Sequence, residues 1–144
     1  VAEFGCGIAP LIAGLVRYYG GRRLQLVGAD LPHLLFHFAR WRLGAVPGVT
    51  FVAIAPGDDT PLVGTYDTIL CCEVFEHLPR PLATIRHLRR ALRHGGHLVC
   101  DFVASDGRGL DTQAAARERD VVLHFLAEQF VVEAHDGLLV GRKR

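Results

Sequence analysis

The chain of 144 residues has no methionine, and its only lysine is Lys143, against fifteen arginines. A catalytic lysine is therefore not expected, because the single candidate lies in the C-terminal tail. The sequence starts without methionine, and its first residues already form a strand-like apolar segment. We therefore expect a single domain, residues 1–144, that lacks an N-terminal segment of a longer protein.

Long apolar runs are also absent. None reaches the roughly 18 residues of a membrane-spanning helix, and no basic segment precedes an apolar one as in a signal peptide. The formal net charge of +1 provides no general attraction to nucleic acid. We therefore expect no membrane partner and regard nucleic acid as a minor alternative.

Cysteine pairs with metal-binding spacing are missing as well. The four cysteines, Cys6, Cys71, Cys72 and Cys100, form no C-x-x-C motif, and three of them lie in or beside apolar segments. This pattern predicts reduced, buried thiols in a cytoplasmic protein and argues against structural zinc.

The residues that are present, half of them apolar and 22% charged, indicate a globular domain. Strand-like and helix-like segments alternate along the chain, and this alternation is typical of a parallel α/β sheet. We predict a doubly wound, mostly parallel, seven-stranded Rossmann-like sheet with a C-terminal antiparallel hairpin around Asp136-Gly137. The expected strands are the first few residues and 24–28, 49–54, 66–72, 97–103, 130–134 and 138–141.

Four helices are expected between these strands. They cover 10–19, a segment that begins at Leu31-Pro32, 81–93 and 112–128, while residues 55–65 form a loop. In the second helix, one apolar face is predicted, made by Leu34, Leu35, Phe38 and Trp41.

The first turn carries the most informative motif. Gly5 and Gly7 follow the first strand at alternate positions, and a helix begins at Pro10. Such a turn presents a helix N-terminus to a nucleotide-like ligand. A dinucleotide fingerprint would require glycine at position 10. The pattern acid-x-Gly-x-Gly-x-Gly fits better, with Glu3 as the acid and Ala9 in place of the last glycine.

This stretch resembles motif I of the class I S-adenosylmethionine (SAM) methyltransferases. Residues 66–79 start with Tyr-Asp and end with Glu-Val-Phe-Glu-His-Leu-Pro, which is similar to strand four and the following loop of that family. Residues 92–99 match its Leu-x-x-Gly-Gly-x-Leu-Val pattern. The resemblance spans nearly the whole chain and implies a SAM-dependent methyltransferase domain with SAM as cofactor.

The resemblance also implies roles for single residues. Asp30, 23 residues after Gly7, would accept hydrogen bonds from the ribose hydroxyls; the alternative is an N-cap of the next helix. Glu3 would contact the amino-acid end of SAM, or alternatively serve the helix dipole. Asp58 would lie near the adenine, with a solvated turn as the alternative. The other implied cofactor-binding residues are Gly5, Cys6, Gly7, Ala9, Leu31, Cys72 and Glu73.

His77 is the candidate catalytic residue. It follows the carboxyl end of the fourth strand, where such sheets bind ligands, and it suits a general base. The alternative is that it only organises the loop. Some relatives, including small-RNA 2′-O-methyltransferases, bind a divalent ion with a trio similar to Glu73, Glu76 and His77, and His124 is a further candidate ligand. We expect no metal.

The expected activity is methyl transfer to an oxygen, nitrogen or carbon atom of a small molecule. Because the loop 104–112 is short for a substrate lid, we expect an open acceptor site, or one completed by another segment or chain. One alternative is an RNA or protein methyltransferase; another is a non-catalytic SAM-binding module of a larger protein. A nicotinamide-dependent oxidoreductase is disfavoured by Pro10 and by the lack of a Tyr-x-x-x-Lys pair. Four arginines on the third predicted helix would favour an RNA substrate, but a helix face exposed to solvent is the simpler interpretation. They are Arg86, Arg89, Arg90 and Arg93.

Overall fold

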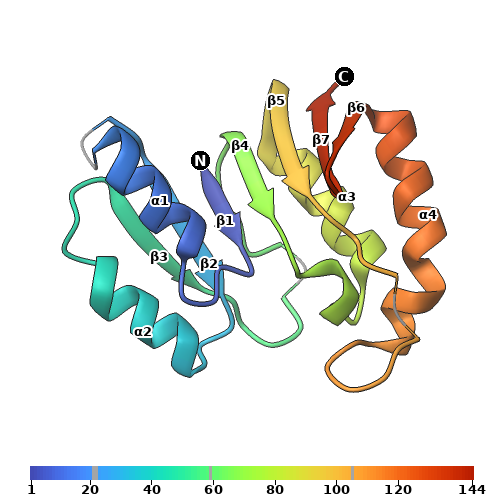
Figure 1. Ribbon diagram of the computed structural model, residues 1–144, viewed down its shortest axis with the longest axis horizontal. Helices are drawn as coiled ribbons and strands as arrows, with labels where there is room; N and C mark the ends of the chain where they lie inside the picture. Colours follow the sequence, from blue (N-terminus) through green and yellow to red (C-terminus); the bar gives the residue numbers. More distant parts are fainter. Residues whose placement is uncertain (21–22, 59, 105) are drawn as a thin grey trace.

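The computed structural model describes residues 1–20, 23–58, 60–104 and 106–144. Within these ranges, seven strands form one sheet in the order β3-β2-β1-β4-β5-β7-β6 (Figure 1). The five parallel strands are β1 (Ala2–Phe4), β2 (Leu26–Asp30), β3 (Val49–Ala53), β4 (Tyr66–Cys71) and β5 (Leu92–Cys100). The antiparallel hairpin is β6 (Phe130–His135) and β7 (Leu138–Lys143). The predicted fold class is confirmed.

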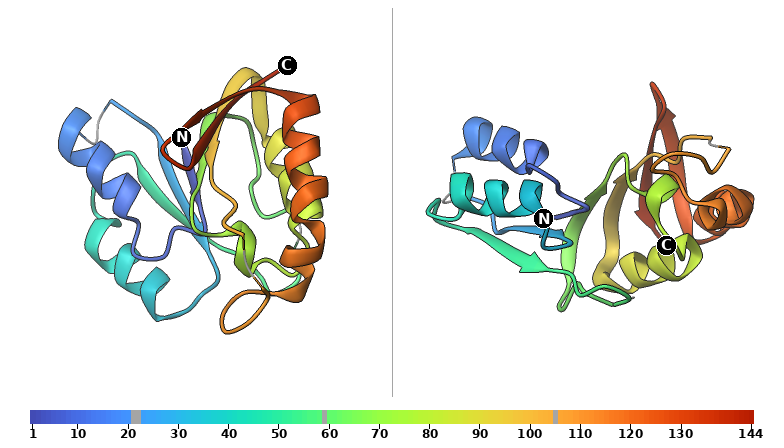
Figure 2. Two further views of the ribbon diagram at one scale, coloured as in Figure 1. Left: turned by 45° about the vertical axis from the view of Figure 1, so that its right-hand side comes forward. Right: turned by 90° about the horizontal axis from the view of Figure 1, so that it is seen from below.

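Helices cover both faces of the sheet. On one face α1 packs against β2 and α2 against β3, and on the other α3 and α4 pack against β5 and β6 (Figure 2). This arrangement follows from right-handed crossovers that leave β1 in opposite directions. The bounds are α1 (Pro10–Tyr19), α2 (Leu34–Leu43), the short 3₁₀ helix η1 (Phe75–His77), α3 (Pro81–Ala91) and α4 (Gln113–Gln129).

The strand order reverses next to β1. The chain runs outward from β1 through β2 to β3, then returns to place β4 on the other side of β1. Doubly wound sheets bind ligands in the crevice beyond the carboxyl ends of the strands at such a reversal. The loops that follow β1, β2, β3, β4 and β5 all meet at this edge.

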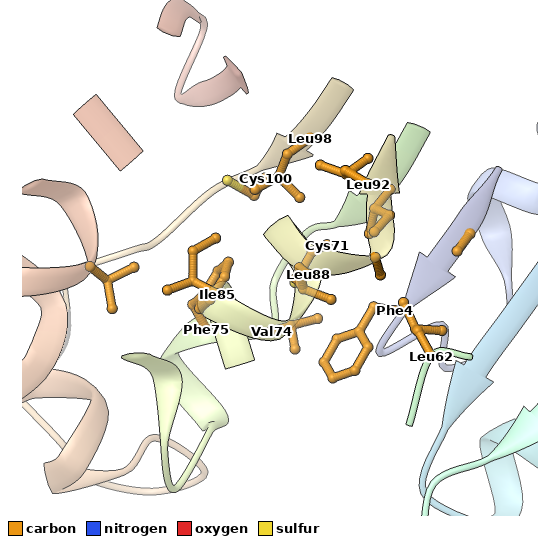
Figure 3. Packing of buried hydrophobic residues seen from close by; sticks show 14 of the residues in the cluster. Phe4, Leu62, Cys71, Val74, Phe75, Ile85, Leu88, Leu92, Leu98 and Cys100 are labelled. Atoms are coloured by element: carbon orange, nitrogen blue, oxygen red, sulfur yellow. The ribbon is translucent and has the colours of Figure 1, made fainter. Parts of the chain in front are cut away.

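Two apolar cores hold the layers together. The larger lies between the sheet and α3 and α4, where Phe4, Val74 and Leu88 are packed (Figure 3). The smaller lies beneath α1 and α2 around Ile12 and Phe36. Strand β1 packs into the larger core, and β2 contributes Leu26 to the smaller core. The two strands beside the crevice are therefore both anchored by buried side chains.

The fifth strand begins earlier than the sequence predicts. Helix α3 ends at Ala91, and β5 starts at Leu92, which pairs with Tyr66 of β4. The expected helix end at 93 and strand start at 97 are wrong, because strand pairing overrides the local helical pattern. A register shift between Tyr66 and Thr68 accommodates the Gly95-Gly96 segment. Since β5 also ends earlier, at Cys100, the loop before α4 is longer than expected.

Helix α2 presents its predicted apolar face to solvent. Leu34, Leu35, Phe38 and Trp41 are exposed, and the side that packs on the sheet is formed by other residues. Apolar side chains occur all around this helix, so periodicity alone could not decide which face the sheet buries. The buried side consists of Phe36, Ala39 and Leu43.

All four cysteines are free thiols. Burial raises the pKa of Cys6 and of Cys100 to about 12, and that of Cys72 to about 11. Such thiols are inert, so they serve packing rather than chemistry. None of the helices in the described part of the chain combines the length and apolar character needed to cross a bilayer.

Candidate cofactor-binding and active site

The turn after β1 is built from residues with left-handed backbone conformation. Gly5, Gly7 and Ala9 have φ angles of 69°, 50° and 54°. The N–H of Gly5 donates to the carbonyl of Ala29 at 2.8 Å, which ties the turn to β2. A Cβ at Gly5 would overlap the Val74 side chain, whereas a Cβ at Gly7 would meet open space. Gly5 is therefore required by packing, and Gly7 leaves its backbone accessible to a ligand.

The Asp30 carboxylate points into this turn. Its Oδ2 accepts the Gly7 N–H at 2.6 Å, and its Oδ1 accepts the Leu31 N–H at 2.7 Å. The interpretation of Asp30 as the N-cap of the next helix is wrong: the N-cap of α2 is His33, whose Nδ1 accepts the Phe36 N–H at 3.2 Å. A carboxylate oxygen has two acceptor positions, so Oδ2 retains one for a ligand hydroxyl, while Oδ1 also lies 3.5 Å from Nε2 of His33.

Glu3 is directed at the start of α1. It is only 5% exposed, and its Oε2 accepts the Ile12 N–H at 2.9 Å. Burial raises the pKa of Glu3, while hydrogen bonds from Ile12 and Leu11 oppose that rise. The carboxylate thus satisfies N–H groups that a helix N-terminus leaves unpaired. This geometry matches the helix-dipole alternative, and a contact between Glu3 and SAM stays a prediction.

A cleft of about 760 Å³ lies beyond the carboxyl edge of the sheet. It reaches from the turn after β1 to the loops that follow β3, β4 and β5. Among the residues predicted for the site, it brings together Gly5, Asp30, Leu31, Asp58, Glu73 and His77. Its wall also contains residues that the sequence reasoning did not identify, namely Phe4, His33, Leu35, Ile54, Val74, Leu78, Pro79, Arg80, Thr84 and Leu110.

Other predicted residues lie outside the cleft wall. Glu3, Cys6 and Ala9 are buried, and Gly7 is not part of the wall either, although its N–H binds Asp30, which is. Cys72 is half-buried, and its Sγ lies 3.9 Å from the Val99 carbonyl. Asp58 reaches the wall, but its Oδ1 accepts the Thr60 N–H at 2.8 Å in a local turn, as the turn alternative describes.

The loop after β4 is strained at Glu73, which has a φ of 56°. Its N–H donates to Oδ1 of Asp101 at 2.7 Å, and Asp101 is buried at the end of β5. The Asp101 carboxylate raises the pKa of Glu73, with smaller contributions from burial and Glu76. Strain of this kind persists only where neighbouring contacts impose it. Asp101 was not identified from the sequence, because it was expected to lie inside the fifth strand.

The His77 ring is held by the loop that precedes α4. Its Nδ1 lies 3.1 Å from Oδ1 of Asp111 and 3.3 Å from the Leu110 carbonyl. Its Nε2 lies 3.8 Å from Oε1 of the buried Glu76. The backbone N–H of Thr112 fixes this loop by donating to the Glu76 carbonyl at 2.9 Å. Asp111 thus orients the imidazole at the cleft wall.

No group of three His, Cys, Asp or Glu side chains suited to a metal ion occurs in the described ranges. Glu73, Glu76 and His77 do not form such a group. His124 is remote from them in its contacts, since its Nε2 pairs with Glu128 at 3.1 Å on α4.

Sequence and structure comparisons identify similar proteins. Residues 2–98 match the family described as "Methyltransferase domain". The chain is 25% identical over 105 residues to a ubiquinone biosynthesis O-methyltransferase of Alkalilimnicola ehrlichii, covering 69% of this chain and 39% of that protein. It is 27% identical over 114 residues to a tRNA U34 carboxymethyltransferase of Alteromonas mediterranea, covering 74% and 33%. The chain thus spans well under half of these relatives' length.

The fold has counterparts among solved structures. A putative caffeoyl-CoA O-methyltransferase from Staphylococcus aureus aligns with a TM-score of 0.73 at 12% identity, covering 99% of this chain and 75% of that one. The strand order and the cleft beside β1 define a Rossmann-like ligand-binding domain. The chain belongs to the methyltransferase domain family, class I enzymes whose methyl donor is SAM.

The residues present fit that cofactor. The cleft places an acid at the end of β2 beside a glycine whose Cβ direction is open. In such folds an acid at the end of the second strand binds the ribose hydroxyls. The glycine-rich turn lets the protein backbone approach the part of the ligand next to the ribose.

Proposed function

We propose that this domain binds SAM in the cleft beside β1 and transfers the methyl group to an oxygen, nitrogen or carbon atom of a small molecule. The observation that carries the proposal is the hydrogen bond from Gly7 to Asp30, whose carboxylate lines a cleft of about 760 Å³. That bond orients the carboxylate, and the cleft continues to the loop that carries His77.

The donor half of the cleft has the residues for a nucleoside. Asp30 would bind the ribose hydroxyls, and Leu31 beside it offers an apolar side chain to the adenine. Gly5 and Gly7 let the backbone approach, and Asp58 lies on the wall nearby. SAM supplies an activated sulfonium methyl group when bound. The residues then have to hold the acceptor in line with it at about 3–3.5 Å.

The acceptor half is mostly apolar, with one titratable ring. Leu78, Pro79 and Leu110 line it together with His77. A largely apolar cleft of this volume, with Glu73, Arg80 and Thr84 as further polar side chains on its wall, suits a small organic acceptor. We assign His77 as the general base that removes a proton from a hydroxyl or amine acceptor, with Asp111 holding its Nδ1 side.

Calorimetry with S-adenosylhomocysteine and with NAD tests the donor assignment. Binding of the first and not of the second is expected, and the opposite result would refute a SAM site. A transfer screen with tritiated SAM over metabolite, RNA and protein pools then tests the acceptor class. Label in metabolites is expected; label only in RNA or protein would overturn the small-molecule assignment, and label in none would favour a binding module without catalysis.

A further inference from the structure

Helix α2 exposes four large apolar side chains, next to the exposed His37, Arg40 and Arg42. Leu34 is 81% exposed and Trp41 is 78% exposed, and the exposed Leu35 and Phe38 lie between them. A surface helix normally turns charged and polar residues to the solvent. We call the set Leu34, Leu35, Phe38 and Trp41 the α2 stripe; Leu34, Phe38 and Trp41 lie opposite the buried Phe36 and Leu43, and Leu35 at the edge of the set also lines the cleft.

The α2 stripe is held rigidly. On the other side of the helix, Phe36 is fully buried against the smaller core. The rings of Phe38 and Trp41 lie 5.7 Å apart, and the Arg42 guanidinium sits 5.7 Å from the Phe38 ring centre. Arg42 also donates to the Ile8 and Ala9 carbonyls in the turn after β1. The aromatic side chains are therefore presented by a fixed platform.

The charged side chains of the helix that carries the α2 stripe have one sign. The acids of β1, α1, β2, α2 and β3 are Glu3 and Asp30, and Asp58 follows in the loop after β3, on the cleft wall that Leu35 also lines. Glu3 is buried, and both Asp30 oxygens accept backbone hydrogen bonds. Helix α2 itself carries Arg40 and Arg42 and no acid. The neighbouring helix α1, on the same face of the sheet, adds Arg17 (Figure 2).

We propose that the α2 stripe docks this domain onto an anionic lipid bilayer. Exposed leucine, phenylalanine and tryptophan supply apolar area, and arginines of the same helix supply positive charge; these are the two attractions that hold a helix in a membrane interface. Tryptophan in particular prefers the headgroup level. The contact is peripheral, and it departs from the sequence-based expectation that the protein has no membrane partner.

The charges favour a bilayer over a second copy of the chain. Two α2 stripes packed against each other would bring arginines of like charge together with no acid of α2 to pair them, which is unfavourable. An anionic headgroup layer instead supplies the complementary charge and accepts the apolar side chains in one contact.

Trp41 provides a direct readout, because it is the only tryptophan of the chain. Its fluorescence is measured while vesicles of phosphatidylglycerol and phosphatidylcholine, or of phosphatidylcholine alone, are added, and bound protein is quantified by co-sedimentation. Binding to the anionic vesicles with a blue-shifted emission is expected. The binding should weaken with salt, and Arg40→Gln should lower the partition coefficient about fivefold.

Two variants locate the contact, and one serves as control. Leu34→Glu and Phe38→Glu should abolish vesicle binding, and Trp41 remains as the probe in both. Val121→Glu introduces the same charge on α4, at a side chain that is 51% exposed, and should bind like the parent. Circular dichroism confirms that each variant is folded. The proposal is overturned if the Trp41 emission does not shift, or if Val121→Glu loses as much vesicle binding as the two stripe variants. It is also overturned if the parent does not bind vesicles and gel filtration shows a dimer that Leu34→Glu dissociates.

Discussion

The carboxylate of Asp30 accepts the backbone N–H of Gly7 at 2.6 Å, joining the end of β2 to the turn after β1. The two residues are 23 positions apart in the chain, so only the parallel pairing of β1 with β2 brings them together. Because the bond is charge-assisted, it orients both the acid and the turn at the edge of the cleft.

Replacement of Asp30 by alanine should weaken S-adenosylhomocysteine binding about tenfold or more, since a charge-assisted hydrogen bond contributes roughly 1.5–3 kcal/mol. Calorimetry measures this loss. Asp120→Ala removes a carboxylate that is almost fully exposed on α4 and should bind like the parent. Equal affinity of the Asp30 variant and the parent would exclude a ribose contact by this residue.

Alanine at the two glycines of the turn should have different effects. Gly5→Ala combines backbone strain with overlap against Val74, and should destabilise the fold by about 2–4 kcal/mol. Gly7→Ala should cost only the strain, about 1–2 kcal/mol, because its Cβ meets open space. It should nevertheless reduce cofactor affinity.

Thermal unfolding and calorimetry on the same two samples separate these effects. A Gly7 variant that binds S-adenosylhomocysteine as tightly as the parent would contradict the placement of the ligand beside this turn.

Ala9→Gly should change the stability of the protein little. Ala9 is the N-cap of α1 in a left-handed conformation that glycine adopts without strain. Relief of that strain, about 1–2 kcal/mol, is offset by the greater entropy of glycine in the unfolded chain, about 0.5–1 kcal/mol, and by loss of a fully buried methyl group, about 0.8 kcal/mol. A melting temperature within about 2 °C of the parent is the expected observation. A drop of roughly 5 °C would show that Ala9 carries no strain.

The Glu73–Asp101 pair predicts a pH dependence of stability. Because Asp101 raises the pKa of Glu73 above its ordinary value of 4.5, the folded state holds this proton more tightly than the unfolded state. This contribution to stability is present below about pH 4.5 and is lost as pH rises through the folded-state pKa. Asp101→Asn retains an acceptor for the Glu73 N–H and removes the charge.

Melting temperatures of the parent and of Asp101→Asn between pH 4 and 7 measure this effect. The decline on raising the pH through this range should be smaller in the variant than in the parent. Parallel profiles would mean that the two carboxyl groups do not interact.

His77→Ala should lower kcat about 100-fold or more with an acceptor that must lose a proton, and leave S-adenosylhomocysteine affinity unchanged. Asp111→Asn should lower kcat less, because the imidazole remains but loses its oriented partner. Single-turnover transfer with the acceptor found in the screen measures both. If the variants lose cofactor affinity while kcat is retained, His77 organises the loop instead.

Prediction from the sequence is accurate where local signals and topology agree. The alternation of segments predicted the sheet, and Asp136-Gly137 predicted the hairpin turn, in which Asp136 and Gly137 have φ angles of 48° and 87°. It failed where long-range pairing decides the outcome. Leu92 is helical by local pattern, yet it joins β5 because Tyr66 pairs with it.

Some residues of the site could be predicted from the sequence and others could not, for the same reason. The glycine turn and Asp30 carry a motif that is contiguous enough to be read from the sequence. Asp101 and Asp111 carry no such motif, because what matters is their contact with Glu73 and His77, 28 and 34 positions away. The orientation of α2 was equally hidden, since the helix is apolar on both sides.

By itself, the order of residues determined the class of fold and the glycine-rich turn to which we assign the nucleoside, because strand alternation and glycine backbone freedom are local properties of the chain. Only the tertiary structure decided that Asp101 contacts Glu73, that Asp111 orients the His77 ring, and which side of α2 faces the solvent. Those outcomes depend on strand register and on competition among apolar faces for one sheet, which arise between segments distant in the chain.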